Sequence, residues 1–485
     1  MVFPRPAPDS GAHGSPRGET AGLRWYVVGV LWAVALGALF SPWSRGLTGD
    51  VWWHLATGAW ILAHHAIPRT NPFGSAAGTT PWINLEWGWD ALTGLLVRVF
   101  GYPGLAAWAL AMVIGVAASQ WVRLRRYGVG PLRRTDAVGL ALLGMALTWA
   151  WRPQLVSFAL IGVWWAILEA SVDRPRRLWT LVPVLLVWEQ LHGGFLLGLG
   201  TLGWWIVDRL WPGATHPLRR REWRTVGPVL GTLALGLGCT PWGYGLVAHG
   251  WQESHNPIIL EWIGEWQAPN FHDPLWLVVL ALPVLVYGVW LYQHPDRVRL
   301  APRWLWGLFV LTLGMTCLAI RNLPFFWLAF ATLMAVTAPR PGRTLRLPIW
   351  AAGLLAAGAL ALMAVQAPRW FIPHRGLTPH LVAILRTRPG LVLNGYRAGD
   401  SLIAYGFPDM VDGRTDLWVA AGTFPATAEM EQGRWAWPRV AAWCRTHHVR
   451  YVLWPIASPG AHELAGRPGW RLLATGAGYG LWTHS

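Results

Sequence analysis

The sequence predicts a mainly α-helical integral membrane protein, with a polytopic transmembrane bundle of about eleven spans and a small C-terminal α/β domain. Composition is the first reason, because 54% of the 485 residues are hydrophobic and only 13% are charged. A soluble domain averages about 25% charged residues. The second reason is that apolar runs of roughly 15 to 20 residues recur along most of the chain. The third is that these runs become much shorter after residue 369, as in buried strands.

The N-terminal arm, residues 1–24, is rich in Pro, Gly, Ser and Arg, and we predict that it is a disordered cytoplasmic arm. The apolar run after it could be a signal peptide, but no small-residue cleavage site follows and many more apolar runs do. We therefore interpret this run as the first span of a transmembrane domain at 25–368. The candidate spans are 25–41, 103–122, 136–151, 155–172, 178–191, 194–211, 226–240, 274–292, 304–320, 323–338 and 347–367.

Arginine decides the predicted orientation, because all 39 basic residues are arginine. With eleven spans, five arginine-rich connections fall on one face of the membrane. The positive-inside rule puts that face and the N-terminus in the cytoplasm of a multi-pass plasma (inner) membrane protein. Arginines in short loops between apolar runs also argue against nucleic acid as a partner. The five connections are 123–134, 174–177, 219–224, 297–303 and 340–346.

Two long connections fall on the outer face, at 41–102 and 240–273, and long loops in compact folds usually carry function. Residues 85–100 of the first connection could form a further span. However, Glu86, Asp90 and Arg98 would each cost about 2.5–3.5 kcal/mol near the bilayer centre. We therefore predict an amphipathic helix that lies on the outer surface.

Residues 369–485 are predicted to form an extracytoplasmic α/β domain. Short apolar runs bounded by turn residues favour strands, and apolar positions at helical spacing favour a helix. The predicted elements are strands at 391–394 and 451–454, a helix at 426–448, and a closing hairpin at 470–483 around Gly476 and Gly478.

Asp50 opens the first outer connection, where it is followed by Trp52, Trp53 and His54. A carboxylate that is partly withdrawn from water has a raised pKa unless a cation or metal holds it ionised, and a raised pKa suits a general base. The alternative is an interfacial Asp that caps the next helix. His54 would share a helical face with Asp50. The two could bind a divalent metal, although two ligands do not define a site.

Arg152 and Arg321 stand alone at the outer ends of spans, against the orientation rule. A guanidinium can bind phosphate through two parallel hydrogen bonds, so each is a candidate for a lipid headgroup or for a lipid-linked substrate. His192 precedes two glycines at an outer turn, where it is either a ligand or a hydrogen-bonded turn residue. Glu265 lies four residues after Glu261, and the two would face the same way in a helix.

Short motifs join these residues along the chain. They are Asp50-Val-Trp-Trp-His54 with Gly58, Ile67-Pro68 with Asn71-Pro72-Phe73, Trp82-Ile-Asn-Leu-Glu86-Trp87, Arg152-Pro153-Gln154, His192-Gly193-Gly194, Thr240-Pro241-Trp242-Gly243, Glu265-Trp266 with Pro269, Arg321, Asn394-Gly395-Tyr396 with Gly399, and Asp412-Gly413-Arg414-Thr415-Asp416. Together they resemble bacterial membrane proteins of the GT-C glycosyltransferase superfamily. More distantly, they resemble the catalytic subunits of oligosaccharyltransferases and protein O-mannosyltransferases.

The resemblance implies an inverting enzyme that takes a sugar from a polyprenyl-phosphate or polyprenyl-diphosphate donor. The acceptor would be a lipid, a glycan or a protein at the outer face of the membrane. Asp50 would be the general base, and Glu265 would assist the acceptor or a divalent metal, which is possible but not required. Arg321 or Arg152 would neutralise the leaving phosphate. The other substrate-binding residues implied are His54, Glu86 and His192.

The chain also departs from these relatives. It has a single Asp in place of the Asp-Glu pair of mannosyltransferases, and its tail lacks the Trp-Trp-Asp-Tyr-Gly motif of oligosaccharyltransferases, so a peptide acceptor has no support. Two other functions stay open, a polytopic transporter or lipid flippase and a non-catalytic envelope assembly protein. Transporters carry ionisable residues near the membrane midplane, whereas the middles of these spans are nearly free of charge.

Overall fold

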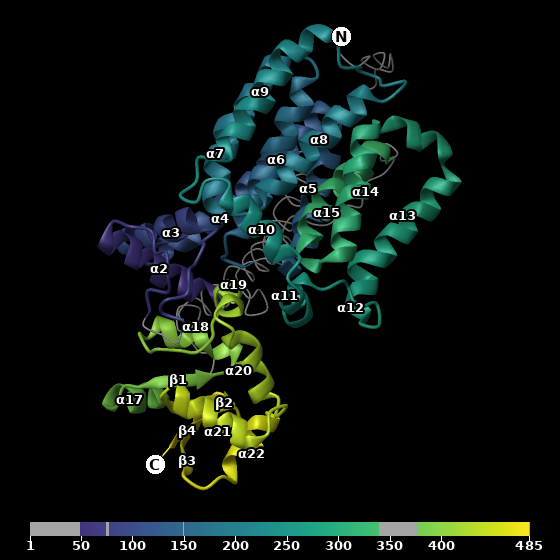
Figure 1. The fold of residues 1–485 in the computed structure, drawn as a ribbon. Coiled ribbons are helices and arrows are strands. Elements are labelled where there is room, and N and C mark those ends of the chain that lie inside the picture. The colour runs from purple at the N-terminus through teal and green to yellow at the C-terminus, as the bar shows by residue number, and fades with distance from the viewer. Residues whose placement is uncertain (1–48, 74–76, 149, 339–376, 485) are drawn as a thin grey trace.

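The computed structural model describes residues 49–73, 77–148, 150–338 and 377–484. These residues form a bundle of helices with a small domain at one end, which contains a four-stranded sheet (Figure 1). The predicted arm at 1–24 and the predicted spans at 25–41 and 347–367 lie outside the described residues.

The bundle is held together by apolar helices that share one continuous core. Helices α6 and α15 are apolar around most of their circumference and mostly buried, as expected for helices that other helices surround. The helices are α4 (Tyr102–Arg126), α5 (Pro131–Met145), α6 (Gln154–Ser171), α7 (Leu181–Leu191), α8 (Phe195–Leu210), α9 (Trp223–Gly236), α10 (Gly245–Ser254), α11 (Pro257–Trp262), α12 (Pro274–Trp276), α13 (Leu282–Gln293), α14 (Arg303–Leu318) and α15 (Leu323–Thr337).

The nine predicted spans that fall on described residues each contain a helix. Among these residues, four helical segments are long and apolar enough to cross a membrane, and a fifth apolar helix, α14, is shorter. Some predicted spans are shortened by turns. Helix α7, for example, starts at Leu181 because a 3₁₀ turn occupies Pro175–Thr180. The structure therefore supports a helical protein with segments that are long and apolar enough to cross a membrane, and the number eleven stays a prediction. The four segments are Tyr102–Arg126, Gln154–Ser171, Pro274–Gln293 and Ile320–Thr337.

The first long connection, predicted to lie on the outer face, contains two packed helices, α2 (Asp50–His64) and α3 (Trp87–Phe100). Helix α3 confirms the helix predicted at 85–100. It buries Trp89 and Asp90 against its neighbours and leaves Val99 and Phe100 exposed. This division into a buried and an exposed face is what an amphipathic helix requires.

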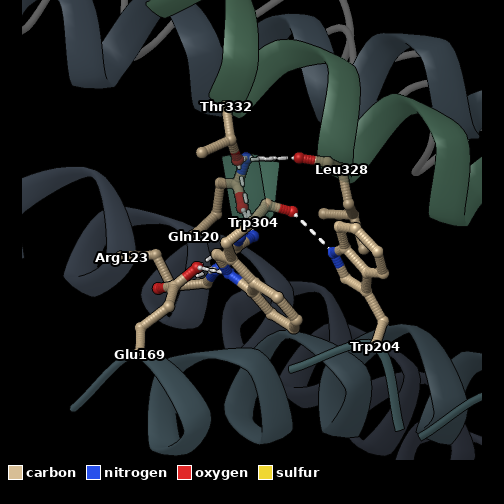
Figure 2. Close-up of polar contacts among 7 residues, drawn as sticks. All are labelled: Gln120, Arg123, Glu169, Trp204, Trp304, Leu328 and Thr332. Atoms are coloured by element: carbon tan, nitrogen blue, oxygen red, sulfur yellow. Dashed lines mark hydrogen bonds and ion pairs between the residues drawn. The ribbon is translucent and has the colours of Figure 1, made fainter. Parts of the chain in front are cut away.

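A buried ion pair lies inside the bundle, near the ends of α4 and α6 (Figure 2). Arg123 donates from Nη2 to Glu169 Oε1 at 2.7 Å, and Trp304 Nε1 donates to the same oxygen at 3.2 Å. Gln120 accepts from Arg123 and donates to Thr332 of α15. The assignment of Arg123 to a connecting loop was wrong, because α4 continues to Arg126 and packs this guanidinium against Glu169. Buried charges are tolerated when they are paired and hydrogen-bonded in this way.

The C-terminal domain is a small α/β fold whose sheet has the strand order β1-β2-β4-β3. Strand β1 pairs with β2 in parallel, and the other pairs are antiparallel. The two predicted strands are confirmed, and so is the closing hairpin, where Ala477 and Gly478 take the positive φ values of a tight turn. The elements are α17 (Pro379–Thr387), β1 (Leu391–Asn394), α18 (Tyr396–Ala404), α19 (Thr415–Ala420), α20 (Thr423–Glu431), α21 (Trp437–Thr446), β2 (Val449–Pro455), α22 (Pro459–Ala465), β3 (Trp470–Gly476) and β4 (Tyr479–His484).

The single helix predicted at 426–448 was wrong, because the structure has two helices there, α20 and α21. Gly433 lies between them with φ of +68°, a left-handed conformation that ends a helix. Pro438 then sits in the first turn of α21, where a missing N–H is harmless.

Candidate functional site

A cavity containing about 690 Å³ of empty space lies where the bundle meets the C-terminal domain. Figure 1 shows this junction, with α2, α18 and α19 between the sheet and the bundle. Segments from five parts of the sequence form its wall, namely the first long connection, the start of α6, the second long connection, the turn between α14 and α15, and the tail. Six of the seven predicted site residues line it, and they are Asp50, His54, Glu86, Arg152, Glu265 and Arg321.

Arg152 binds two carboxylates inside this cavity. Its Nε donates to Asp50 Oδ2 at 2.9 Å, and its Nη1 and Nη2 donate to Glu265 at 3.0–3.1 Å. Asp50 is in the first turn of α2, Arg152 immediately precedes α6, and Glu265 is in a 3₁₀ turn. Burial alone would lower the pKa of Arg152, but the two carboxylates outweigh it and raise that pKa above its ordinary value. The three residues thus form one ion-paired unit.

This unit changes the expectations for the two lone arginines. The guanidinium of Arg152 already binds two carboxylates, so it is not available to bind phosphate through two parallel hydrogen bonds. Arg321 lies over the ring of Trp266, with its Cζ 4.0 Å from the ring centroid. Within the described residues, its guanidinium has no hydrogen bond or ion pair. Arg321 is therefore the cation of this cavity that can accept an anionic ligand.

His54 is fixed by a neighbouring helix. Its Nδ1 lies 2.5 Å from Asp90 Oδ1 of α3, and Asn84 Nδ2 donates to the other oxygen of Asp90 at 2.6 Å. Burial lowers the pKa of His54 to about 3, although Asp50 opposes that change. Burial also raises the pKa of Asp90. The contact with Asp90 fixes the orientation of the His54 ring, as a carboxylate partner does for a ligand histidine.

A second group of acids lines the cavity close to Arg321. Burial, and then the charge of Glu253, raise the pKa of Glu86. Burial and Asp416 raise the pKa of Glu253 to about 7. Asp416 also lies 3.3 Å from His249 Nε2. Within the described ranges, no group of three or more His, Cys, Asp or Glu side chains is arranged to hold a metal ion.

The tail completes the cavity through the loop that precedes α19. Gly413 lies against the ion-paired unit so closely that a Cβ there would be 2.4 Å from Asp50 Oδ1 and 2.7 Å from Trp53 Nε1. Arg414 is buried, where it binds Asp412 through Nε and Nη2 and donates from Nη1 to Asn71 Oδ1 at 2.8 Å. These contacts attach the tail to the first long connection.

His192 was predicted to bind substrate, but the structure places it elsewhere. It is 7% exposed and does not line the cavity. Its Nδ1 lies 2.6 Å from Ser157 Oγ and accepts from the backbone N–H of Gly194 at 3.0 Å. His192 is thus the hydrogen-bonded turn residue that the sequence left open as its alternative.

Glu261 and Glu265 would share a face only in a single helix, and the structure has no such helix there. Helix α11 ends at Trp262, and Glu265 lies in the separate turn Gly264–Trp266. Glu265 points toward Arg152, whereas Glu261 is exposed and does not line the cavity.

Sequence reasoning missed four residues of the cavity wall. Glu253 carried no motif signal. Tyr396, Gly413 and Asp416 belong to motifs of the tail that do not by themselves indicate a role for these residues. Comparison of the chain with protein-family models and with curated proteins gave no match. Function is therefore inferred from the chemistry that this cavity brings together.

Proposed function

We propose that the protein is a membrane glycosyltransferase that transfers a sugar from a polyprenyl-phosphate or polyprenyl-diphosphate donor to an acceptor hydroxyl at the outer face of the plasma membrane. One observation carries the proposal. Asp50 and Glu265 bind a single guanidinium, that of Arg152, inside a cavity that Arg321 also lines. A carboxylate that accepts a proton and a cation that stabilises a leaving phosphate are the two groups such a transfer needs.

Asp50 is the proposed general base. Its Oδ2 accepts from Arg152, and Asp50 lines the cavity. The acceptor hydroxyl would give its proton to this carboxylate while its oxygen attacks the anomeric carbon of the sugar. The bond from that carbon to the phosphate oxygen breaks on the opposite side, so the configuration inverts. Glu265, on the same guanidinium, would hold Arg152 and thereby Asp50 in place.

Arg321 is the proposed partner of the leaving phosphate. Stacking on Trp266 fixes its plane while leaving its N–H donors free within the described residues. Two acids near it would repel a phosphate if both were ionised. Burial and their neighbours raise the pKa of Glu86 and raise that of Glu253 to about 7, which favours their neutral forms. The repulsion is correspondingly reduced near neutral pH.

Aromatic residues supply the remaining wall of the cavity. Trp53, Trp82, Trp266 and Tyr396 line it. Trp53 Nε1 is buried and has no hydrogen-bond partner in the part of the chain that the structure describes. A buried donor of this kind is usually satisfied by water or by a ligand, and a sugar hydroxyl would satisfy it. Aromatic faces and one such donor suit a sugar better than a fully apolar substrate.

The decisive experiment compares Asp50→Asn with the wild type. The donor is identified by mass spectrometry of a polyprenyl-linked sugar that co-purifies with the full-length protein, and transfer is followed with that donor in radiolabelled form. Removing a general base should lower the rate by about 10² to 10⁴. Asp296→Asn, at an exposed position, is the control and should keep the wild-type rate.

Normal transfer by Asp50→Asn, with normal expression, would remove Asp50 from the mechanism. Movement of the lipid-linked sugar across proteoliposomes without any product would instead favour a transporter or flippase.

A further inference from the structure

We propose that the bundle contains a second binding site, for a phosphate group, at the end opposite the candidate active site. A cavity with about 610 Å³ of empty space lies there, between the ends of α4, α6 and α8 and the start of α14. Arg126, Arg209 and Arg303 line it, together with the indole rings of Trp205 and Trp304.

Helix α6 shows that the two cavities lie at opposite ends of the bundle. Pro153 and Gln154, where α6 begins, line the candidate active site, and Val172, which follows its last residue, lines the second cavity. The helix has 18 residues, which corresponds to a length of about 27 Å. The hydrocarbon core of a bilayer is about 30 Å thick. The distance between the two cavities thus allows each of them to lie at a different surface of the membrane.

Arg209 carries the proposal. Its side chain is 4% exposed, its Nη2 donates to Glu222 at 2.8 Å, and its Nε donates to the backbone oxygen of His216 at 3.0 Å. Its Nη1 is buried and has no hydrogen-bond partner among the described residues. The guanidinium also lies over Trp205, 4.6 Å from the ring centroid. It is therefore rigidly held with one donor unused.

An unused N–H of a buried guanidinium is costly, and a charged acceptor is its best partner. The acids that line the cavity are Glu169 and Asp208. Arg123 binds Glu169 from the core side (Figure 2), so Glu169 is already compensated. Asp208 lies 3.5 Å from Arg303 Nε. Arg126 and Arg209 also have carboxylate partners, Asp173 and Glu222, which do not line the cavity. The arginines of the lining outnumber its acids, and the unused Nη1 of Arg209 is the group that would attract an anion.

Phosphate is the anion class that best fits three arginines around a cavity at the end of the bundle. Two sources offer it, the phosphodiester of an anionic lipid headgroup and a soluble phosphate. The indole rings and Val172 give the cavity apolar wall beside the arginines, which suits the glycerol portion of a lipid. The bound group is the same in either case, a phosphate oxygen at Arg209 Nη1.

The test uses full-length protein purified in detergent and native mass spectrometry with phosphatidylglycerol. Diacylglycerol, which has no phosphate, is the lipid control. Arg209→Ala should weaken phosphatidylglycerol binding by about tenfold, the value of a charge-assisted hydrogen bond. Arg176→Ala removes the same charge from an exposed position at this end of the bundle that does not line the cavity, and it should leave binding unchanged.

Asp208→Asn separates a lost site from a misfolded protein. It removes a competing carboxylate from the lining and should strengthen phosphatidylglycerol binding, which a merely damaged protein would not do. Inorganic pyrophosphate identifies the source, because displacement of the lipid by pyrophosphate indicates a soluble ligand and resistance to it indicates a lipid. Equal binding of both phosphate probes by wild type, Arg209→Ala and Asp208→Asn, or equal binding of diacylglycerol and phosphatidylglycerol, would overturn the proposal.

Discussion

At the scale of single residues, the candidate site depends on which carboxylate reaches which arginine. Arg152 holds Asp50 and Glu265 in one plane of hydrogen bonds, and Arg321 stays available beside them. Removing one partner of a half-buried pair leaves an uncompensated charge, which costs more than the pair contributes. In the proposed mechanism, Arg152 therefore positions the base, and Arg321 binds the ligand.

Gly413 tests this arrangement without altering any charge. A Cβ at 413 would lie 2.4 Å from Asp50 Oδ1, so Gly413→Ala should push Asp50 away from Arg152. We expect sugar transfer to fall by about a hundredfold, since misplacing a reacting group by about 1 Å has that effect. The measurement is transfer rate together with the unfolding midpoint. Gly466→Ala in the same domain, where the nearest atom is 4.0 Å away, should keep the rate. An active Gly413→Ala enzyme would show that Asp50 need not stay on Arg152.

The raised pKa of Glu253 predicts how the stability of the protein depends on pH. Its pKa is raised from 4.5 to about 7, by burial first and then by Asp416. Between these two values the folded state binds more protons at this site than the unfolded state, so stability falls as the pH rises. Glu253→Gln abolishes this titration. The variant should gain in unfolding midpoint over the wild type between pH 5 and about pH 8.

The control for that series is Glu261→Gln, the same change at an exposed position. The unfolding midpoint of each protein is measured in detergent at several pH values. A difference between Glu253→Gln and wild type that stays constant from pH 5 to about pH 8 would contradict the assignment of the raised pKa to Glu253.

Sequence reasoning worked for residues that break a general rule. Asp50, Arg152 and Arg321 attracted attention because they are charged at the predicted outer ends of apolar spans, and the structure brings all three to one cavity. Glu253 and Asp416 broke no rule, since acids in polar loops are ordinary. Only the fold shows that both line one cavity, because residues 253 and 416 are 163 positions apart in the sequence.

At the scale of elements, α2 and α3 position half of the cavity wall. They approach so closely that a Cβ at Gly58 would be 2.0 Å from the backbone oxygen of Asp90 and 3.1 Å from Gly94 Cα. This contact brings His54 to Asp90 across the same interface. Small residues at a helix crossing allow such an approach, as they do between membrane helices.

A tightly packed helix glycine and an unhindered one should have opposite effects on stability when each is replaced by alanine. Replacing an unhindered glycine in a helix by alanine is usually stabilising, by about 0.5–1 kcal/mol. Gly231→Ala in α9, where no atom lies within 4 Å of the new Cβ, should follow that rule. Gly58→Ala should instead destabilise the protein, because its Cβ would meet backbone that cannot move aside. Unfolding midpoints of the two variants measure the signs, and a Gly58→Ala variant at or above the wild-type midpoint would contradict the close packing.

Element boundaries were predicted less well than element types. Periodicity located the helices of the bundle and the strands of the tail, because burial of apolar faces sets both. It failed between 426 and 448, where Gly433 adopts a left-handed backbone that apolar spacing does not reveal. It also failed at Arg123, since a buried ion pair looks like a loop arginine when its partner Glu169 lies on another helix.

At the scale of the whole molecule, the tail is part of the candidate site. Arg414 is enclosed by Asp412, Asn71 and the rings of Phe73 and Trp82. A fully buried guanidinium with such partners fixes one geometry, because few other arrangements satisfy its five donors. The C-terminal domain thus completes the cavity that the first long connection also lines. Residues 71 and 414 are far apart in sequence, so this docking could not be predicted from the motifs alone.

The docked tail makes the orientation of the chain testable. If α6 crosses the membrane, the tail and the connection after α6 lie on opposite sides, with the tail outside according to the positive-inside rule. Single cysteines are placed by Arg471→Cys on β3 and Arg176→Cys after α6, both at exposed positions, after the exposed Cys239 and Cys317 are replaced by serine. A membrane-impermeant maleimide should label the cysteine at 471 in intact cells and the cysteine at 176 only after lysis. The reverse labelling pattern would mean that the chain has the opposite orientation in the membrane, with Asp50 on the cytoplasmic side. Labelling of both cysteines in intact cells would instead mean that the bundle between them does not cross the membrane.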